Sequence, residues 1–61
     1  MSERILVVED ELAVIEMLQD SLSYAGYQVA VARDGQQALA MLKESYFNLV
    51  ILDVVMPRLN G

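Results

Sequence analysis

The chain has 61 residues, which is enough for one small domain and too few for two. A hydrophobic fraction of 56% excludes a disordered chain, and a formal net charge of −5 disfavours contact with nucleic acids or anionic membranes, because both are negatively charged. Cysteine is absent, which excludes disulfides and thiolate metal sites and favours a reducing, cytoplasmic location.

The first predicted element is a short strand at residues 5–8. These residues read Ile-Leu-Val-Val, an apolar run typical of a parallel strand that is buried on both faces. The run stops at three acids, Glu9, Asp10 and Glu11. It is too short for the core of a signal peptide or for a membrane helix, so we expect a soluble chain that is not exported.

The spacing of apolar residues predicts a helix over residues 12–25. The apolar residues that recur three and four positions apart are Ile15, Leu18, Leu22 and Ala25. Gly26 follows at the position of a left-handed C-terminal cap. Residues 27–32 then alternate in polarity, which predicts a second strand.

A second helix is predicted after Asp34. This residue can cap the helix N-terminus, and Gln37 completes a pair that resembles a capping box. The residues expected on the apolar face are Ala38, Leu39 and Leu42. A third apolar strand at residues 49–52 ends in an acid, Asp53, and Pro57 prevents the strand from continuing as a paired ladder.

Strands that alternate with helices predict right-handed parallel crossovers. If the second crossover returns past the first strand, the strand order is second, first, third. The carboxyl ends of parallel strands meet at one edge, where ligands bind, so Glu9, Asp10 and Asp53 would converge there. Clustered carboxylates repel one another unless a cation joins them, and Mg²⁺ fits such oxygen ligands best. An acidic, solvated loop is the alternative interpretation.

Two segments resemble a known family. Residues 4–11 read Arg-Ile-Leu-Val-Val-Glu-Asp-Glu, and residues 49–61 read Leu-Val-Ile-Leu-Asp-Val-Val-Met-Pro-Arg-Leu-Asn-Gly. Together they resemble the receiver domain of two-component response regulators, and the resemblance covers the whole chain. It implies a flavodoxin-like, doubly wound parallel α/β sheet, truncated here to βαβαβ with strand order 2-1-3.

The resemblance also implies a site. Asp53 would accept a phosphoryl group from a phosphohistidine on a sensor histidine kinase or a phosphotransfer protein. The residues that would hold Mg²⁺ are Glu9, Asp10, Asp53 and Val55, the last through its backbone carbonyl. A receiver of this kind catalyses its own phosphorylation and dephosphorylation, so we expect no enzyme with a separate substrate.

A whole receiver, as the resemblance implies, has two further strands that carry a Ser or Thr and a Lys for the phosphoryl group. Lys43, the one lysine of this chain, lies in the second predicted helix instead. We therefore expect residues 1–61 to be the N-terminal half of a receiver domain, in which phosphorylation is impaired.

Three alternatives compete with this interpretation. A phosphatase of the haloacid dehalogenase type needs an Asp-x-Asp motif after the first strand, where this chain has Glu9, Asp10 and Glu11. A dinucleotide-binding turn needs glycines, and none precedes Gly26. The third is a truncated or engineered half-receiver that self-associates as a structural scaffold without signalling.

Self-association follows from size and from the third strand. A chain this small buries only about 60% of the surface that its unfolded form exposes. In the expected strand order, residues 49–52 form an apolar edge strand, which recruits a partner. We therefore expect a homo-oligomer, either a two-fold dimer through this strand or a strand-exchanged one.

Overall fold

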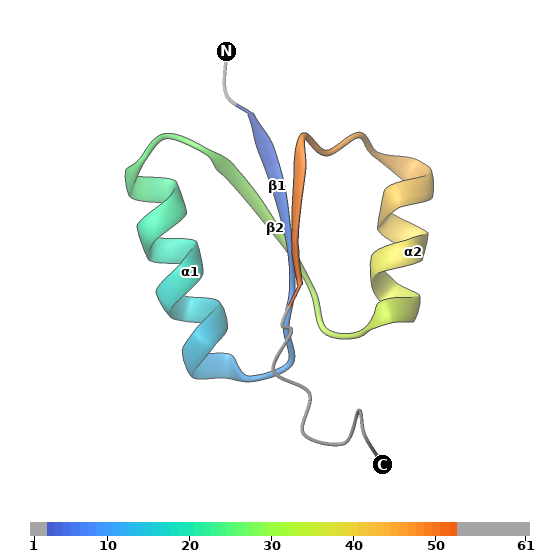
Figure 1. Ribbon diagram of the computed structural model, residues 1–61, viewed down its shortest axis with the longest axis horizontal. Coiled ribbons are helices and arrows are strands. Elements are labelled where there is room, and N and C mark those ends of the chain that lie inside the picture. Colours follow the sequence, from blue (N-terminus) through green and yellow to red (C-terminus); the bar gives the residue numbers. More distant parts are fainter. Residues whose placement is uncertain (1–2, 53–61) are drawn as a thin grey trace.

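The computed structural model describes residues 3–52, which form a three-stranded sheet with one helix on each side (Figure 1). The elements, in chain order, are β1 (Arg4–Val8), α1 (Leu12–Tyr24), β2 (Gln28–Ala32), α2 (Gly35–Glu44) and β3 (Leu49–Leu52). The strand order is β2-β1-β3, and both pairings are parallel. This arrangement confirms the predicted flavodoxin-like βαβαβ fold. No helix in the described part of the chain is long and apolar enough to span a membrane.

Gly26 ends the first helix and turns the chain toward β2. Its φ angle is 102°, a left-handed conformation that residues with a Cβ rarely adopt, and its N–H donates to the Ser23 carbonyl at 2.9 Å. The helix therefore ends at Tyr24 and the next strand begins at Gln28. The predicted helix and the predicted second strand are each one residue too long at the end that faces the glycine.

The N-terminus of α2 carries the predicted cap. The Asp34 Oδ1 atom accepts a hydrogen bond from the Gln37 N–H at 2.8 Å, which satisfies a backbone donor that has no partner within the helix. The Gln37 Oε1 atom accepts from the Arg33 N–H at 2.7 Å. The reciprocal bond of this capping pair thus reaches the residue before the cap, and it fixes the backbone between β2 and α2.

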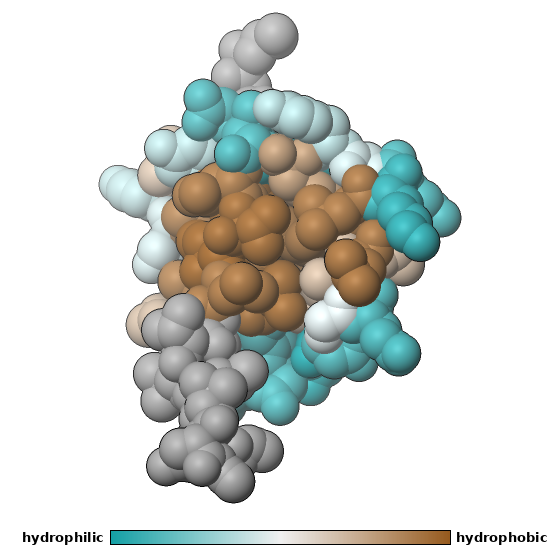
Figure 2. All heavy atoms as spheres, turned by 45° about the vertical axis from the view of Figure 1, so that its right-hand side comes forward, coloured by the Kyte–Doolittle hydropathy of each residue, from teal (hydrophilic) through white to brown (hydrophobic). Residues whose placement is uncertain are grey.

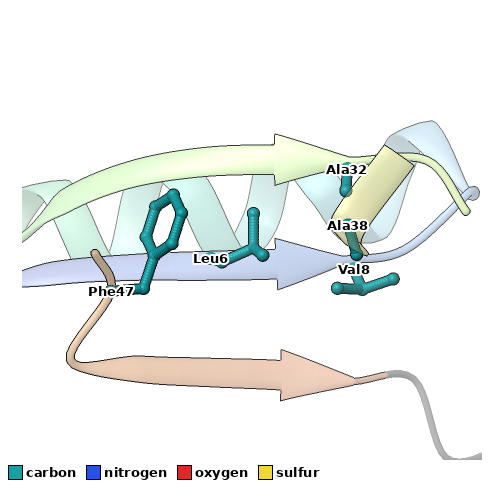
Figure 3. Close-up of a cluster of buried hydrophobic side chains, with 5 residues drawn as sticks. All are labelled: Leu6, Val8, Ala32, Ala38 and Phe47. Atoms are coloured by element: carbon teal, nitrogen blue, oxygen red, sulfur yellow. The ribbon is translucent and has the colours of Figure 1, made fainter. Parts of the chain in front are cut away.

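The main core lies between the sheet and α2. Its buried side chains are Leu6, Val8, Ala32, Ala38 and Phe47, which Figure 3 shows on one face of the sheet. Because successive side chains of a strand alternate between faces, Ile5 and Val7 are buried on the opposite face, the side on which α1 lies. The central strand is therefore buried on both faces, as its apolar sequence predicts.

The predicted apolar face of α2 is partly wrong. Ala38 is the buried residue of this helix, and Met41 packs against the core. Leu39 is 61% exposed and Leu42 is 41% exposed. Residues three apart share a helix face, whereas the next residue along is rotated by about 100°, so Met41 follows Ala38 inward and Leu39 turns away.

The third strand is the least covered element of the sheet. Both helices pack against β2 and α2 also packs against β1, whereas neither packs to a similar extent against β3. Leu49 and Leu52 are therefore 53% and 59% exposed. On the side of the molecule shown in Figure 2, apolar side chains form one patch with a hydrophilic border. The expected apolar edge strand is confirmed within residues 3–52.

Candidate functional site

The candidate site lies at the carboxyl edge of the sheet. Val8, at the end of the central strand, is in register with Ala32 on one side and with Leu52 on the other. The three strands thus end level at this edge. Glu9 follows the central strand directly. Two residues of the predicted site, Asp53 and Val55, lie outside the described residues.

Glu9 is held firmly at this edge. Its N–H donates to the Ala32 carbonyl at 3.0 Å, which extends the pairing with β2 beyond the end of β1. Its side chain is only 7% exposed, and its Oε2 atom accepts a hydrogen bond from the Glu11 N–H at 3.1 Å. A buried carboxylate costs free energy unless hydrogen bonds or a cation compensate it. In the described part of the chain, no buried side-chain oxygen is left without a hydrogen-bond partner.

Asp10 is the exposed member of the predicted pair. Its backbone carbonyl accepts a hydrogen bond from the Arg33 Nη2 atom at 3.2 Å. Glu11 then begins the first helix as its N-cap, with extended backbone and without a side-chain capping bond. The acidic run therefore splits into a buried residue, an exposed residue and a helix cap, and these three positions have different surroundings.

The described part of the site contains two carboxylates that are adjacent in the sequence, those of Glu9 and Asp10. Oxygen donors of this kind suit Mg²⁺, which uses one or two carboxylates and keeps several waters. Between Glu3 and Leu52, no three acidic side chains gather closely enough to hold a metal ion by themselves. Glu11 therefore does not complete a site with its two neighbours, and the third carboxylate of the sequence prediction is the one at position 53.

Arg33 also belongs to this edge, although no motif in the sequence points to it. It directly follows Ala32 at the end of β2. Glu9 directly follows Val8, which is in register with Ala32. The hydrogen bond from the Arg33 guanidinium to the Asp10 carbonyl joins residues 23 positions apart in the sequence. The signal that could have found it is its position directly after a strand in the expected parallel sheet.

These features define a class of protein. A parallel α/β sheet with a buried acid after its central strand is a doubly wound domain with an acidic site at its carboxyl edge. The sequence matches the response regulator receiver domain over residues 5–61. The chain belongs to this family, as the resemblance of its acidic run and of its third-strand segment predicted.

Curated relatives match along the whole chain. The chain is 52% identical over 61 residues to "Response regulator MprA" of Mycobacterium tuberculosis, covering 100% of this chain and 26% of that protein. It is 46% identical over 59 residues to "Probable transcriptional regulator ycf27" of Cyanophora paradoxa, covering 97% of this chain and 25% of the relative. The chain thus spans about a quarter of the length of these relatives. No solved structure matches it.

Proposed function

We propose that this chain is a phosphoacceptor module of a two-component response regulator. Asp53 takes a phosphoryl group from a phosphohistidine on a sensor histidine kinase or a phosphotransfer protein. The Mg²⁺ ligands in this proposal are Glu9, Asp10, Asp53 and the backbone carbonyl of Val55. Membership of the receiver family supports the part of the proposal that assigns the chain to a response regulator.

The single observation that carries the proposed site is the buried carboxylate of Glu9 at the end of the central strand. Glu9 is 7% exposed, its Oε2 atom accepts from the Glu11 N–H, and Asp10 adds a second carboxylate at the next position in the sequence. The register of β1 with β3 brings Leu52, the residue before Asp53, beside Val8, the residue before Glu9. The proposed nucleophile and the proposed metal ligand are therefore the next residues of two adjacent, level strands.

The proposed reaction is a transfer between two nucleophiles. A carboxylate oxygen of Asp53 attacks phosphorus, a new P–O bond forms, and the P–N bond of the phosphohistidine breaks. The imidazole nitrogen leaves with the electron pair of that bond. Bound Mg²⁺ supplies charge neutralisation at the phosphoryl oxygens, where negative charge collects in the transition state. Attack by water at phosphorus later releases inorganic phosphate and restores the Asp53 carboxylate, so no separate substrate is turned over.

We expect the reaction of the 61-residue chain to be slow. Lys43 lies in the last turn of α2, whereas the N-terminus of that helix follows β2 at the acidic edge, so the lysine is at the far end of the helix from the site. No lysine other than Lys43 is present in the sequence to neutralise the transferred group. The loss of one preorganised contact to a developing charge costs about 10²–10³ in rate.

The experiment that tests the proposal is reaction with a small acyl phosphate and Mg²⁺, followed by mass spectrometry of the intact chain. We expect a slow gain of one phosphoryl group that depends on Mg²⁺ and is abolished by Asp53→Asn. The matched control is Asp20→Asn, which removes an exposed carboxylate from α1 and leaves the label unchanged. Labelling that survives the Asp53→Asn change would remove this residue from its proposed role.

We further propose that the chain acts in the cytoplasm and forms dimers through β3. The strand carries no charge and its outer backbone groups are unpaired within residues 3–52, so two copies with a net charge of −5 can approach there without like charges in contact. A two-fold pairing of β3 with β3 is self-complementary and closed. Because the net charge is negative, we propose no nucleic acid contact by this segment.

A further inference from the structure

Arg33 and Arg4 make side-chain hydrogen bonds at opposite ends of the strands. The Arg33 Nη2 atom donates to the Asp10 carbonyl at 3.2 Å, at the acidic edge. The Arg4 Nη1 atom donates to the Tyr46 carbonyl at 3.3 Å, before the start of β3. The Arg4 guanidinium also lies over the Phe47 ring at 4.7 Å, so it has a packing role there. Arg33 is exposed, and its one described side-chain bond is to the acidic loop.

The backbone of Arg33 is fixed independently of its side chain. Its N–H donates to the Gln37 Oε1 atom at 2.7 Å, within the capping pair of α2. The preceding residue, Ala32, accepts from the Glu9 N–H at 3.0 Å. The arginine is therefore held on both sides, and its guanidinium reaches the loop from a rigid base.

Of the three acids in the loop at residues 9–11, Asp10 is the one whose position depends on the hydrogen bond from Arg33. Glu9 is held by its bond to β2 and by burial, and Glu11 is held as the N-cap of α1. The side chain of Asp10 is exposed and has no hydrogen bond within residues 3–52, so its direction depends on the backbone that carries it. The bond from Arg33 to the Asp10 carbonyl is the described contact that links this residue to a different element.

We infer that Arg33 is a positioning residue for the acidic site: its guanidinium holds the backbone of Asp10 and thereby aims the Asp10 carboxylate toward a bound divalent cation. This inference rests on the proposed function, because it takes Glu9 and Asp10 as metal ligands. Partners that orient metal ligands from the second layer commonly affect metal affinity by about 10–100-fold. An exposed bond at 3.2 Å is expected to have a smaller effect, about three- to tenfold.

The charge of Arg33 opposes its positioning effect. A guanidinium near the site repels Mg²⁺, so removal of Arg33 strengthens cation binding through charge and weakens it through loss of the hydrogen bond. Salt separates the two effects, because the screening length falls to about 3 Å at 1 M ionic strength. The Mg²⁺ affinity measured at high salt therefore reports the effect of the hydrogen bond between Arg33 and the Asp10 carbonyl.

The experiment is a titration with Mg²⁺ alone in about 1 M KCl, followed by amide NMR of the full chain. The variants are Arg33→Met, which removes the donor and the charge, and Arg33→Lys, which keeps a charged donor. Lys43→Met is the matched control, because it makes the same charge change at an exposed position at the far end of α2. Solvent exchange of the Glu11 amide in the metal-free chain reports the loop without any cation.

We expect Arg33→Met to weaken Mg²⁺ binding about three- to tenfold at high salt and to speed exchange of the Glu11 amide. Arg33→Lys should restore much of both properties, and Lys43→Met should match the wild type. If the wild type binds Mg²⁺ and the Arg33→Met variant binds it equally well or more tightly, only the role of Arg33 is overturned. A wild type whose amides do not respond to Mg²⁺ overturns the proposed metal site, and the role of Arg33 with it.

Discussion

The N–H of Glu9 donates to the carbonyl of Ala32 at 3.0 Å, so the pairing of β1 with β2 continues one residue past the end of β1. This bond places the acidic residue inside the sheet ladder rather than in a free loop. Glu9 is 7% exposed, whereas the next residue, Asp10, is exposed. Two acids that are neighbours in sequence thereby differ in rigidity and in solvation.

We predict that Glu9→Gln weakens Mg²⁺ binding by at least about tenfold, because it removes a charged oxygen ligand and keeps the shape of the side chain. The free energy of unfolding without metal should change by less than about 1 kcal/mol, since the amide oxygen can still accept from the Glu11 N–H. Amide NMR titration and urea unfolding measure the two quantities. Glu16→Gln, at an exposed position of α1, is the control and should bind like the wild type.

Leu6 and Leu39 give a matched pair for the core. Leu6 is fully buried at the centre of the sheet, whereas Leu39 is 61% exposed on α2. Leu6→Ala should lower the free energy of unfolding by about 2–5 kcal/mol, because it removes packed methyl groups and leaves a cavity. Leu39→Ala should lower it by less than about 0.5 kcal/mol. Equal effects of the two substitutions in urea unfolding would contradict the described core.

Asp34→Ala removes the cap of α2. The Gln37 N–H then loses its acceptor, and we expect the free energy of unfolding to fall by about 1 kcal/mol. Asp34→Asn keeps an acceptor and should lose less. Urea unfolding followed by circular dichroism measures the difference, and equal losses in the two variants would show that charge rather than capping stabilises this turn.

The exposed edge of β3 predicts an effect of charge on assembly. Ile51→Lys should dissociate or unfold a dimer that forms through this strand, because a buried ammonium without a partner is costly. Light scattering and sedimentation measure the mass. Leu39→Lys is the control, since it places the same charge on the exposed surface of α2. A wild-type chain that stays monomeric at high concentration, with a cooperative unfolding transition, would contradict the dimer.

Much of the fold could be predicted from the sequence because its strands end abruptly. The change from apolar residues to acids after Val8 fixes the end of β1, and the predicted third strand coincides with Leu49–Leu52. The buried face of α2 is harder to predict from the sequence, because Leu39 and Met41 are both apolar and only packing distinguishes them. The sheet decides between them, and Met41 contacts the core while Leu39 does not.

The candidate site could be predicted only in part. The acids that directly follow the first strand predict Glu9 and Asp10 as site residues, and the register of β1 with β2 puts the end of that strand at the expected edge. No local pattern encodes the backbone bond from Glu9 to β2, nor the burial of Glu9 next to an exposed Asp10. Arg33 likewise contacts this loop from a distant segment, since strand pairing rather than sequence spacing brings the two together.

The central position of β1 has a consequence for folding. Its two pairings close loops of different length, as Arg4 pairs with Gln28 and Ile5 pairs with Leu49. Loop-closure entropy separates these events by only about 0.5 kcal/mol, so packing decides their order. Both helices pack against β2, which favours early assembly of β1 with β2 and late docking of β3. The strand that leads to Asp53 is then the first part of the sheet to open, and its amides should exchange with solvent sooner than those of β1.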